Sequence, residues 1–164
     1  MTLTSTQIGS LAENLVANEL MIESRGRLSP FQPIADDDGI DVLIYDKKSG
    51  KSAPLQIKAR TSTINKRGKQ ERGNTVHFEH RKATLNIKRN SFLLCVLLDK
   101  SLRITERAWL IPLRVVPRIA ADRKDKYVIR ANKQAKTNDK FKKYQCANMV
   151  AVTKKLFEYF ENAT

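Results

Sequence analysis

The run SFLLCVLLD, residues 91–99, constrains the fold more than any other segment of the chain. A continuous apolar run of strand length is typical of a strand whose two faces are both buried. Such a strand lies inside a sheet that is covered on both sides. The run AWLIPL predicts the next strand, which ends at Pro112, because proline cannot donate a backbone hydrogen bond to a sheet. We therefore expect both runs to be strands of one layered core.

A helix is expected at each end of the chain. Residues 4–23 begin with TSTQ, a Ser/Thr-x-x-Gln capping box, and continue with apolar residues at helical spacing. This stripe comprises Ile8, Leu11, Ala12, Leu15, Val16 and Ile22. Glu13 lies at the edge of the stripe, and Glu19 lies inside it, where the sequence offers no reason for an acid. Residues 139–160 predict the closing helix, with an apolar face of Phe141, Tyr144, Val152, Leu156 and Phe160.

Two alternating runs, IDVLIYD and KSAPLQIKA, are separated by KKSG and predict a β-hairpin. Because strand side chains alternate between the faces of a sheet, Gln56 and Lys58 share one face of the second strand. A turn centred between Lys48 and Ser49 places Asp41 of the first strand across from Gln56. The hairpin therefore predicts a carboxylate, an amide and a lysine in one place.

The expected elements follow in the order helix, hairpin, further strands and closing helix. Residues 61–74 are polar and basic with two glycines, which predicts a loop or a long hairpin, and residues 82–88 predict a short helix. At 164 residues the chain is about the size of one domain. We therefore expect a single α/β domain over residues 1–164, with a central mixed β-sheet flanked by helices.

The formal net charge of the chain is +14, and the positive charge is concentrated in two segments. Residues 58–90 carry ten basic and two acidic side chains, and residues 122–143 carry nine and three. A surface this positive attracts polyanions and gains affinity by releasing their condensed counterions. Nucleic acid, DNA above all, is the expected partner. The alternatives are a basic surface kept for solubility, an anionic membrane or an acidic protein.

The chain has no apolar run near the roughly 18 residues of a membrane-spanning helix, and its first residues lack the pattern of a secretion signal. We therefore expect a soluble, cytoplasmic protein without a membrane partner. Cys95 in an apolar strand and Cys146 in a helical stretch are too few for a disulfide framework and predict reduced core thiols. His77 and His80 lack further ligands at a spacing that would complete a zinc site.

Four side chains form the candidate site: Glu13, Asp41, Gln56 and Lys58. Hydrolysis of a phosphodiester at neutral pH needs a metal ion that activates water and offsets the charge of the phosphate. Hard ions such as Mg²⁺ prefer oxygen ligands, which the two carboxylates and the amide supply. A lysine on the same strand face can orient or activate the water, or stabilise charge in the transition state. The combination predicts a metal-dependent nuclease site.

These residues resemble the motifs of the PD-(D/E)XK nuclease superfamily, in particular its Mrr-like restriction and Holliday-junction-resolvase-like branches. GSLAE, residues 9–13, is similar to the family's first-helix Gly-x-x-x-Glu. DGID, residues 38–41, is similar to its metal-binding aspartate at the start of a strand. QIK, residues 56–58, is similar to its (D/E)-x-K in the Q-x-K variant. By motif the resemblance covers residues 8–60, and by element order the remainder.

The resemblance implies a restriction-endonuclease-like core and a DNA endonuclease that uses Mg²⁺ or Mn²⁺. It implies that Glu13, Asp41 and Gln56 surround the metal, that Lys58 is catalytic, and that the protein acts as a homodimer, as many members do. Ile40 stands where the motif's name has proline, and Gln56 replaces an acid, which removes one negative charge from the site. The alternative hypothesis is therefore a catalytically inactive nucleic-acid-binding domain on the same scaffold.

Phosphate contacts are expected from nine basic residues: Arg60, Arg67, Lys69, Arg72, Lys133, Lys136, Lys140, Lys142 and Lys143. Such contacts position a nucleic acid without reading its sequence, and the alternative for each residue is a solvated basic face. Trp109 and Tyr127 are either base-stacking residues or core packing. Asp36 and Asp37 are expected to form a solvated turn, and Asp38 belongs either to that turn or to the site.

Overall fold

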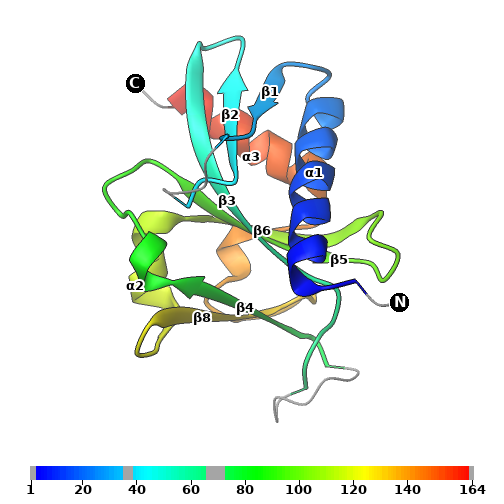
Figure 1. The fold of residues 1–164 in the computed structure, drawn as a ribbon, viewed down its shortest axis with the longest axis vertical. Helices are drawn as coiled ribbons and strands as arrows, with labels where there is room; N and C mark the ends of the chain where they lie inside the picture. Colours follow the sequence, from blue (N-terminus) through cyan, green and yellow to red (C-terminus); the bar gives the residue numbers. More distant parts are fainter. Residues whose placement is uncertain (1–2, 35–38, 66–72, 163–164) are drawn as a thin grey trace.

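The computed structural model describes residues 3–34, 39–65 and 73–162, and Figure 1 shows their fold. The larger sheet has the strand order β1-β2-β3-β5-β6-β9 and the smaller one the order β4-β8-β7. The strands of the larger sheet are β1 Leu28–Phe31, β2 Val42–Asp46, β3 Lys51–Arg60, β5 Phe92–Leu98, β6 Thr105–Pro112 and β9 Gln145–Cys146. Those of the smaller sheet are β4 Thr75–Arg81, β7 Ala121–Asp122 and β8 Lys126–Asn132. The α-helices are α1 Ser5–Glu23, α2 Val116–Ile119 and α3 Met149–Asn162, and the 3-10 helices are Lys82–Thr84, Leu113–Val115 and Lys142–Tyr144.

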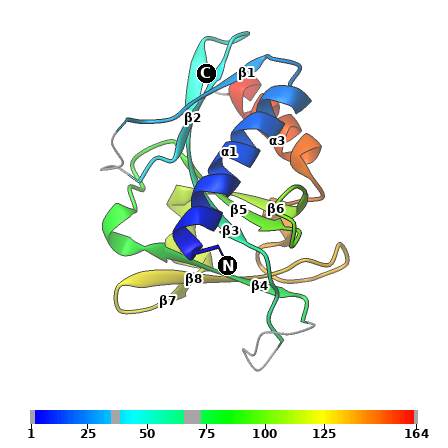
Figure 2. The same cartoon turned by 45° about the vertical axis from the view of Figure 1, so that its right-hand side comes forward.

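The larger sheet is the middle of three layers. Helices α1 and α3 cover one face, and the smaller sheet covers the other (Figures 1 and 2). Strand β5 is buried along its whole length: Leu94 and Val96 face the helices, whereas Leu93 and Cys95 face the smaller sheet. It pairs with β3 in parallel and with β6 in antiparallel orientation. The predicted central strand and mixed sheet flanked by helices are confirmed.

The hairpin of β2 and β3 has the register that the sequence predicts. Val42 pairs with Leu55 and Asp46 with Lys51, so the turn is centred between positions 48 and 49. The backbone N–H of Asp41 donates to the carbonyl of Leu55 at 3.0 Å. Asp41 therefore lies at the level of the neighbouring Gln56.

Helix α1 begins as predicted but buries a different face. The Thr4 hydroxyl accepts from the Gln7 N–H at 3.2 Å, and the Gln7 side chain accepts from the Thr4 N–H at 2.9 Å, so the capping box is present. The expected burial of Leu11 and Ile22 is wrong, since they are 46% and 67% exposed. The buried residues are Ala12, Val16, Ala17 and Leu20. Around the helix, Val16, Leu20 and Ala17 lie on one side of Ala12. Leu11 and Ile22 lie on its other side, roughly 80 to 100° away, and so outside the buried arc.

The contact of α1 with the β5–β6 end of the sheet explains the acid in its apolar stripe. The carboxylate of Glu19 accepts a hydrogen bond from the buried Thr105 hydroxyl at 2.7 Å. Burial raises the pKa of Glu19, and the hydrogen bond partly opposes that effect. A carboxylate in an apolar stripe is tolerated because it has a partner.

The predicted C-terminal helix over residues 139–160 is too long, because α3 begins only at Met149. The preceding backbone is held by other contacts: the Asp139 carboxylate accepts from two backbone N–H groups, and Cys146 pairs with Ala108 of β6. Cys146 is therefore in a strand instead of a helix, and Phe141 packs in the core beneath the smaller sheet. Both cysteines are buried free thiols, and burial raises the pKa of each.

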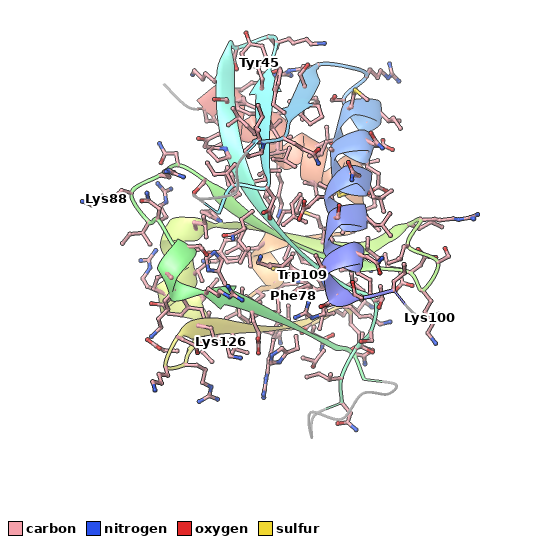
Figure 3. The ribbon with its side chains drawn as sticks, in the orientation of Figure 1. Tyr45, Phe78, Lys88, Lys100, Trp109 and Lys126 are labelled. Carbon is pink, nitrogen blue, oxygen red and sulfur yellow. The ribbon has the colours of Figure 1, made fainter. Side chains whose placement is uncertain are left out.

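The sequence did not reveal β1, β4, β7 or β8. The predicted short helix over 82–88 is a single 3-10 turn, Lys82–Thr84. Within the 61–74 connection Ile64 bridges to Thr75, so this connection starts as a hairpin, and residues 66–72 lie outside the described part of the chain. Trp109 is completely buried against Phe78, with ring centroids 5.8 Å apart, so it is a core residue (Figure 3). In the described residues, no helix is both long enough and apolar enough to cross a membrane.

Candidate functional site

Glu13 and Asp41 come together in a hollow between α1 and the segment that leads into β2. The hollow has a volume of about 210 Å³. Its lining comprises Ser10, Glu13, Asn14, Gln32, Pro33, Ile40 and Asp41. Glu13 reaches the hollow because it is half-buried within the buried arc of α1, between Leu20 and Ala17. Asp41 reaches it from the start of the hairpin. The structure therefore brings the two predicted carboxylates to one polar cleft.

The carboxylate of Asp41 is held against strand β3. Its Oδ2 atom accepts a hydrogen bond from the backbone N–H of Ile57 at 2.5 Å. Ile57 stands between Gln56 and Lys58, and its own side chain points into the core with the helices. The hydrogen bond therefore anchors Asp41 at the centre of the QIK motif, as the predicted register requires.

Gln56 is 5% exposed and lines a small cavity next to that hollow. The cavity has a volume of about 10 Å³ and shares Ile40 with the larger hollow. Among the described residues, the Gln56 amide oxygen has no hydrogen-bond partner although it is buried. A buried oxygen without a partner is costly, so a cation or a water molecule is needed to satisfy it.

Gly39 makes room for the Gln56 amide. Its φ of +66° lies in the left-handed region, which favours glycine. A Cβ atom at this position would lie 3.0 Å from the Thr84 Cβ and 3.3 Å from the Gln56 Nε2. The glycine of DGID therefore serves both the turn and the packing of the site.

We expect Gly39→Ala to destabilise the protein by about 2 kcal/mol, because a side chain is strained at this φ and the new methyl group crowds the Gln56 amide. Gly50→Ala is the matched control: Gly50 has a φ of +71°, but a Cβ atom added there would have no neighbour within 4 Å. It should destabilise the protein by only about 1 kcal/mol. Urea unfolding measures both losses. Equal destabilisation by the two substitutions would show that the contact with Gln56 is unimportant.

Lys58 extends from the same face of β3 as Gln56, toward the smaller sheet. It pairs with Cys95 of β5 in the parallel register and is half-buried. Burial lowers the pKa of His80 on β4, and the Lys58 charge lowers it further. His80 Nδ1 lies 2.8 Å from the Arg81 carbonyl, so Nδ1 carries the proton and donates. The surroundings of Lys58 are therefore a neutral imidazole and a buried thiol.

The predicted phosphate-binding residues are dispersed in the structure. Arg60 is exposed next to Lys58, and its Nε donates to the His77 carbonyl at 2.9 Å. Five of them lie between β8 and α3, and none of these lines the hollow of Glu13: Lys133, Lys136, Lys140, Lys142 and Lys143. Lys142 Nζ donates to the carbonyl of Ala135 and to Gln145 Oε1. The other three, Arg67, Lys69 and Arg72, lie outside the described residues, as do Asp36 to Asp38 of the predicted turn.

Two residues that sequence analysis missed line the Gln56 cavity. Arg89 and Ser91 come from the segment between the 3-10 turn and β5, and no motif marks them. In the described ranges, no three His, Cys, Asp or Glu side chains gather closely enough to hold a metal ion. The predicted oxygen ligands at the site are the carboxylates of Glu13 and Asp41 and the amide of Gln56, and Ser10, Asn14 and Gln32 add further side-chain oxygens to the hollow.

No known protein family and no curated protein matches this sequence. Among solved structures, the bacterial homing endonuclease I-Ssp6803I is similar over 95% of both chains, with a TM-score of 0.56 and 15% identity. The Holliday junction resolvase Hjc of Archaeoglobus fulgidus is similar over 74% of this chain and 83% of its own, with a TM-score of 0.48 and 8% identity. The chain has a restriction-endonuclease-like fold, as the sequence predicted.

Proposed function

We propose that this protein is a metal-dependent DNA endonuclease that hydrolyses phosphodiester bonds. The observation that carries the proposal is the placement of Asp41: its carboxylate is bound to β3 between Gln56 and Lys58 and shares a cleft with Glu13. Two carboxylates, an amide oxygen and a lysine are the groups that this reaction needs.

Glu13, Asp41 and Gln56 are the residues that would hold Mg²⁺ or Mn²⁺. The Gln56 amide oxygen supports this assignment, because it is buried and has no protein partner in the described part of the chain. When bound, the ion would lower the pKa of the attacking water and offset the charge of the phosphate. The Ile57 N–H fixes one oxygen of Asp41 and thereby orients the other.

Lys58 is the proposed catalytic residue. Its ammonium group is a donor that can orient the attacking water and stabilise the charge that develops on the phosphate. The neighbouring His80 is kept neutral by burial and by the Lys58 charge, which both lower its pKa. It therefore adds no second positive charge next to the lysine.

DNA is the proposed partner because the chain carries a net charge of +14, and positive surfaces bind the phosphate backbone with a strong dependence on salt. We further propose a homodimer in which each subunit cuts one strand. Arg60 lies next to the site, whereas the lysines between β8 and α3 would contact phosphates farther along the duplex.

The second candidate function is a catalytically inactive nucleic-acid-binding domain on the same fold. The replacement of an acid by Gln56 favours it, since the site has one negative charge fewer for a cation. Both functions require binding that weakens with salt, but only the endonuclease requires cleavage.

The two functions are separated by incubating the protein with labelled linear duplex, four-way junction and single-stranded DNA. Each substrate is tested with Mg²⁺, with Mn²⁺ and with EDTA. The endonuclease cuts at least one substrate in the presence of metal and none in EDTA. Salt-sensitive binding of all substrates without cutting in either metal would support the inactive domain instead.

A further inference from the structure

A second hollow lies between α3 and the adjoining ends of β5 and β6. Its volume is about 590 Å³, which is in the range of ligand-binding clefts. Three cationic side chains line it, Arg114, Lys143 and Lys155, together with one acid, Glu158. Positive charge therefore dominates the hollow, and an anionic ligand is favoured.

An apolar recess of about 100 Å³ opens beside this hollow. Phe92, Pro112 and Tyr159 line it together with Arg89 and Arg114. The Tyr159 ring is held by edge contacts with Phe92, at a centroid distance of 4.9 Å, and with Phe160, at 5.3 Å. Aromatic rings next to arginine are the surfaces on which single-stranded nucleic acids stack their bases.

Two of the cations in the larger hollow are held in place before any ligand binds. Lys155 Nζ donates to the carbonyls of Lys143 and Gln145 at 3.2 and 3.3 Å. Lys143 Nζ lies 4.9 Å from the centroid of the Tyr144 ring. Because these contacts already order the side chains, less conformational entropy is lost when an anion binds.

The recess adjoins the candidate catalytic site. Arg89 and Ser91 line both the recess and the Gln56 cavity, and Ile40 joins that cavity to the hollow of Glu13 and Asp41. Figure 3 labels Lys88, the neighbour of Arg89, at the left-hand edge of the molecule. A strand whose phosphate lies at Asp41 therefore has a short route to Tyr159.

We propose that the recess receives an unstacked base of the nucleic acid strand bound at the candidate site, with Arg114 and Lys143 contacting the phosphates of that strand. A base inside a duplex must first be unpaired and unstacked, which costs free energy, so a base that is already unpaired is favoured to enter. The inference rests on the proposed function and adds a substrate class to it: DNA with unpaired nucleotides next to the position of cleavage.

The test is fluorescence anisotropy in EDTA, so that binding is measured without cleavage. The probes are a labelled duplex and the same duplex with a short unpaired thymidine tail. We expect the wild-type protein to bind the tailed probe about tenfold more tightly, since stacking of one base contributes an advantage of this order. Arg114→Ala and Tyr159→Leu should remove that advantage and change duplex affinity less than about twofold.

Arg103→Ala is the charge-matched control for Arg114→Ala. Arg103 is exposed in the β5–β6 turn, the turn of Lys100, which Figure 3 labels at the edge opposite Lys88. This control should keep the advantage of the tailed probe. Tyr159 packs on Phe92, and its replacement can disturb folding. The comparison of Arg114→Ala with Arg103→Ala is therefore the deciding test, because both arginines are exposed. The proposal is overturned if the tail adds no affinity, or if Arg114→Ala and Arg103→Ala have equal effects.

The same probes in Mg²⁺ separate this inference from the proposed function. Preference for the tail without cleavage supports the recess and contradicts the endonuclease. Cleavage with equal affinity for both probes supports the endonuclease and contradicts the recess. Photo-crosslinking of a 4-thiothymidine tail, mapped by mass spectrometry, should identify peptides of α3 that contain Tyr159. Crosslinks confined to other elements contradict the placement of the base.

Discussion

Lys58→Ala is expected to reduce metal-dependent cleavage by about 10²- to 10⁴-fold, since a positioned group that orients the water or stabilises charge in the transition state contributes this much. The loss should appear in the single-turnover rate constant of cleavage. Affinity for DNA in EDTA should fall less than about threefold, because Lys58 is one of 31 basic residues. The thermal unfolding midpoint should remain close to that of the wild type.

Lys51→Ala is the matched control for this variant. Lys51 is at the first position of the same strand, is exposed, and lines neither the hollow of Glu13 nor the Gln56 cavity. It loses the same charge and should retain full activity. Asp41→Asn is a companion variant, because its amide oxygen can still accept from the Ile57 N–H while the negative charge is lost. If Lys58→Ala cleaves DNA as fast as the wild type, Lys58 is not a catalytic residue.

Asp46→Ala is expected to lower the free energy of unfolding by about 3 kcal/mol, the order found when one partner of a buried ion pair is removed. Asp46 is completely buried at the end of β2. Its carboxylate accepts from Arg27 Nε at 2.7 Å and Nη2 at 3.0 Å, and from the backbone N–H groups of Lys48 and Ser49. The guanidinium would lose this buried partner. Urea unfolding at pH 7 measures the loss.

The same carboxylate predicts how stability depends on pH. The hydrogen bond from Arg27 holds the pKa of Asp46 well below its usual range of about 4. Its contribution is therefore complete above the pKa of the unfolded state and is lost as the pH falls toward the folded value. Asp46→Asn should flatten the decline of stability between about pH 4 and pH 2. Glu161→Gln is the control, since Glu161 contacts Arg27 at the surface. It should change the free energy of unfolding by less than about 1 kcal/mol.

Local patterns were sufficient for the parts of the fold that depend on neighbouring residues. The alternation of IDVLIYD and KSAPLQIKA, joined by a short turn, set the register that brings Asp41 to Gln56. The TSTQ box set the start of α1, and the uninterrupted apolar run set β5 as the central strand. In each case the chemistry lies within a few residues of the element that it specifies.

Other parts of the fold depended on partners far away in the chain. The buried face of α1 includes Ala17 and Leu20, which the apolar stripe predicted from the sequence did not contain. The residues before Met149 have apolar side chains at helical spacing, but Cys146 pairs with Ala108 of β6 instead of continuing a helix. Strand β4 was not predicted from the sequence, because it is stabilised by pairing with β8, which begins at Lys126. Periodicity describes which faces are apolar, but it does not state which surface will cover them.

The sequence by itself determined the composition of the candidate site: two carboxylates, an amide and a lysine, in an order and spacing that resemble a nuclease motif. Only the tertiary structure decided that Glu13 shares a hollow with Asp41, that the Gln56 oxygen is buried without a protein partner among the described residues, and that Arg89 joins the site to the recess of Tyr159. The physical reason is that residue types and local spacing are properties of short segments. Burial, cavities and shared walls arise where segments distant in the chain pack together.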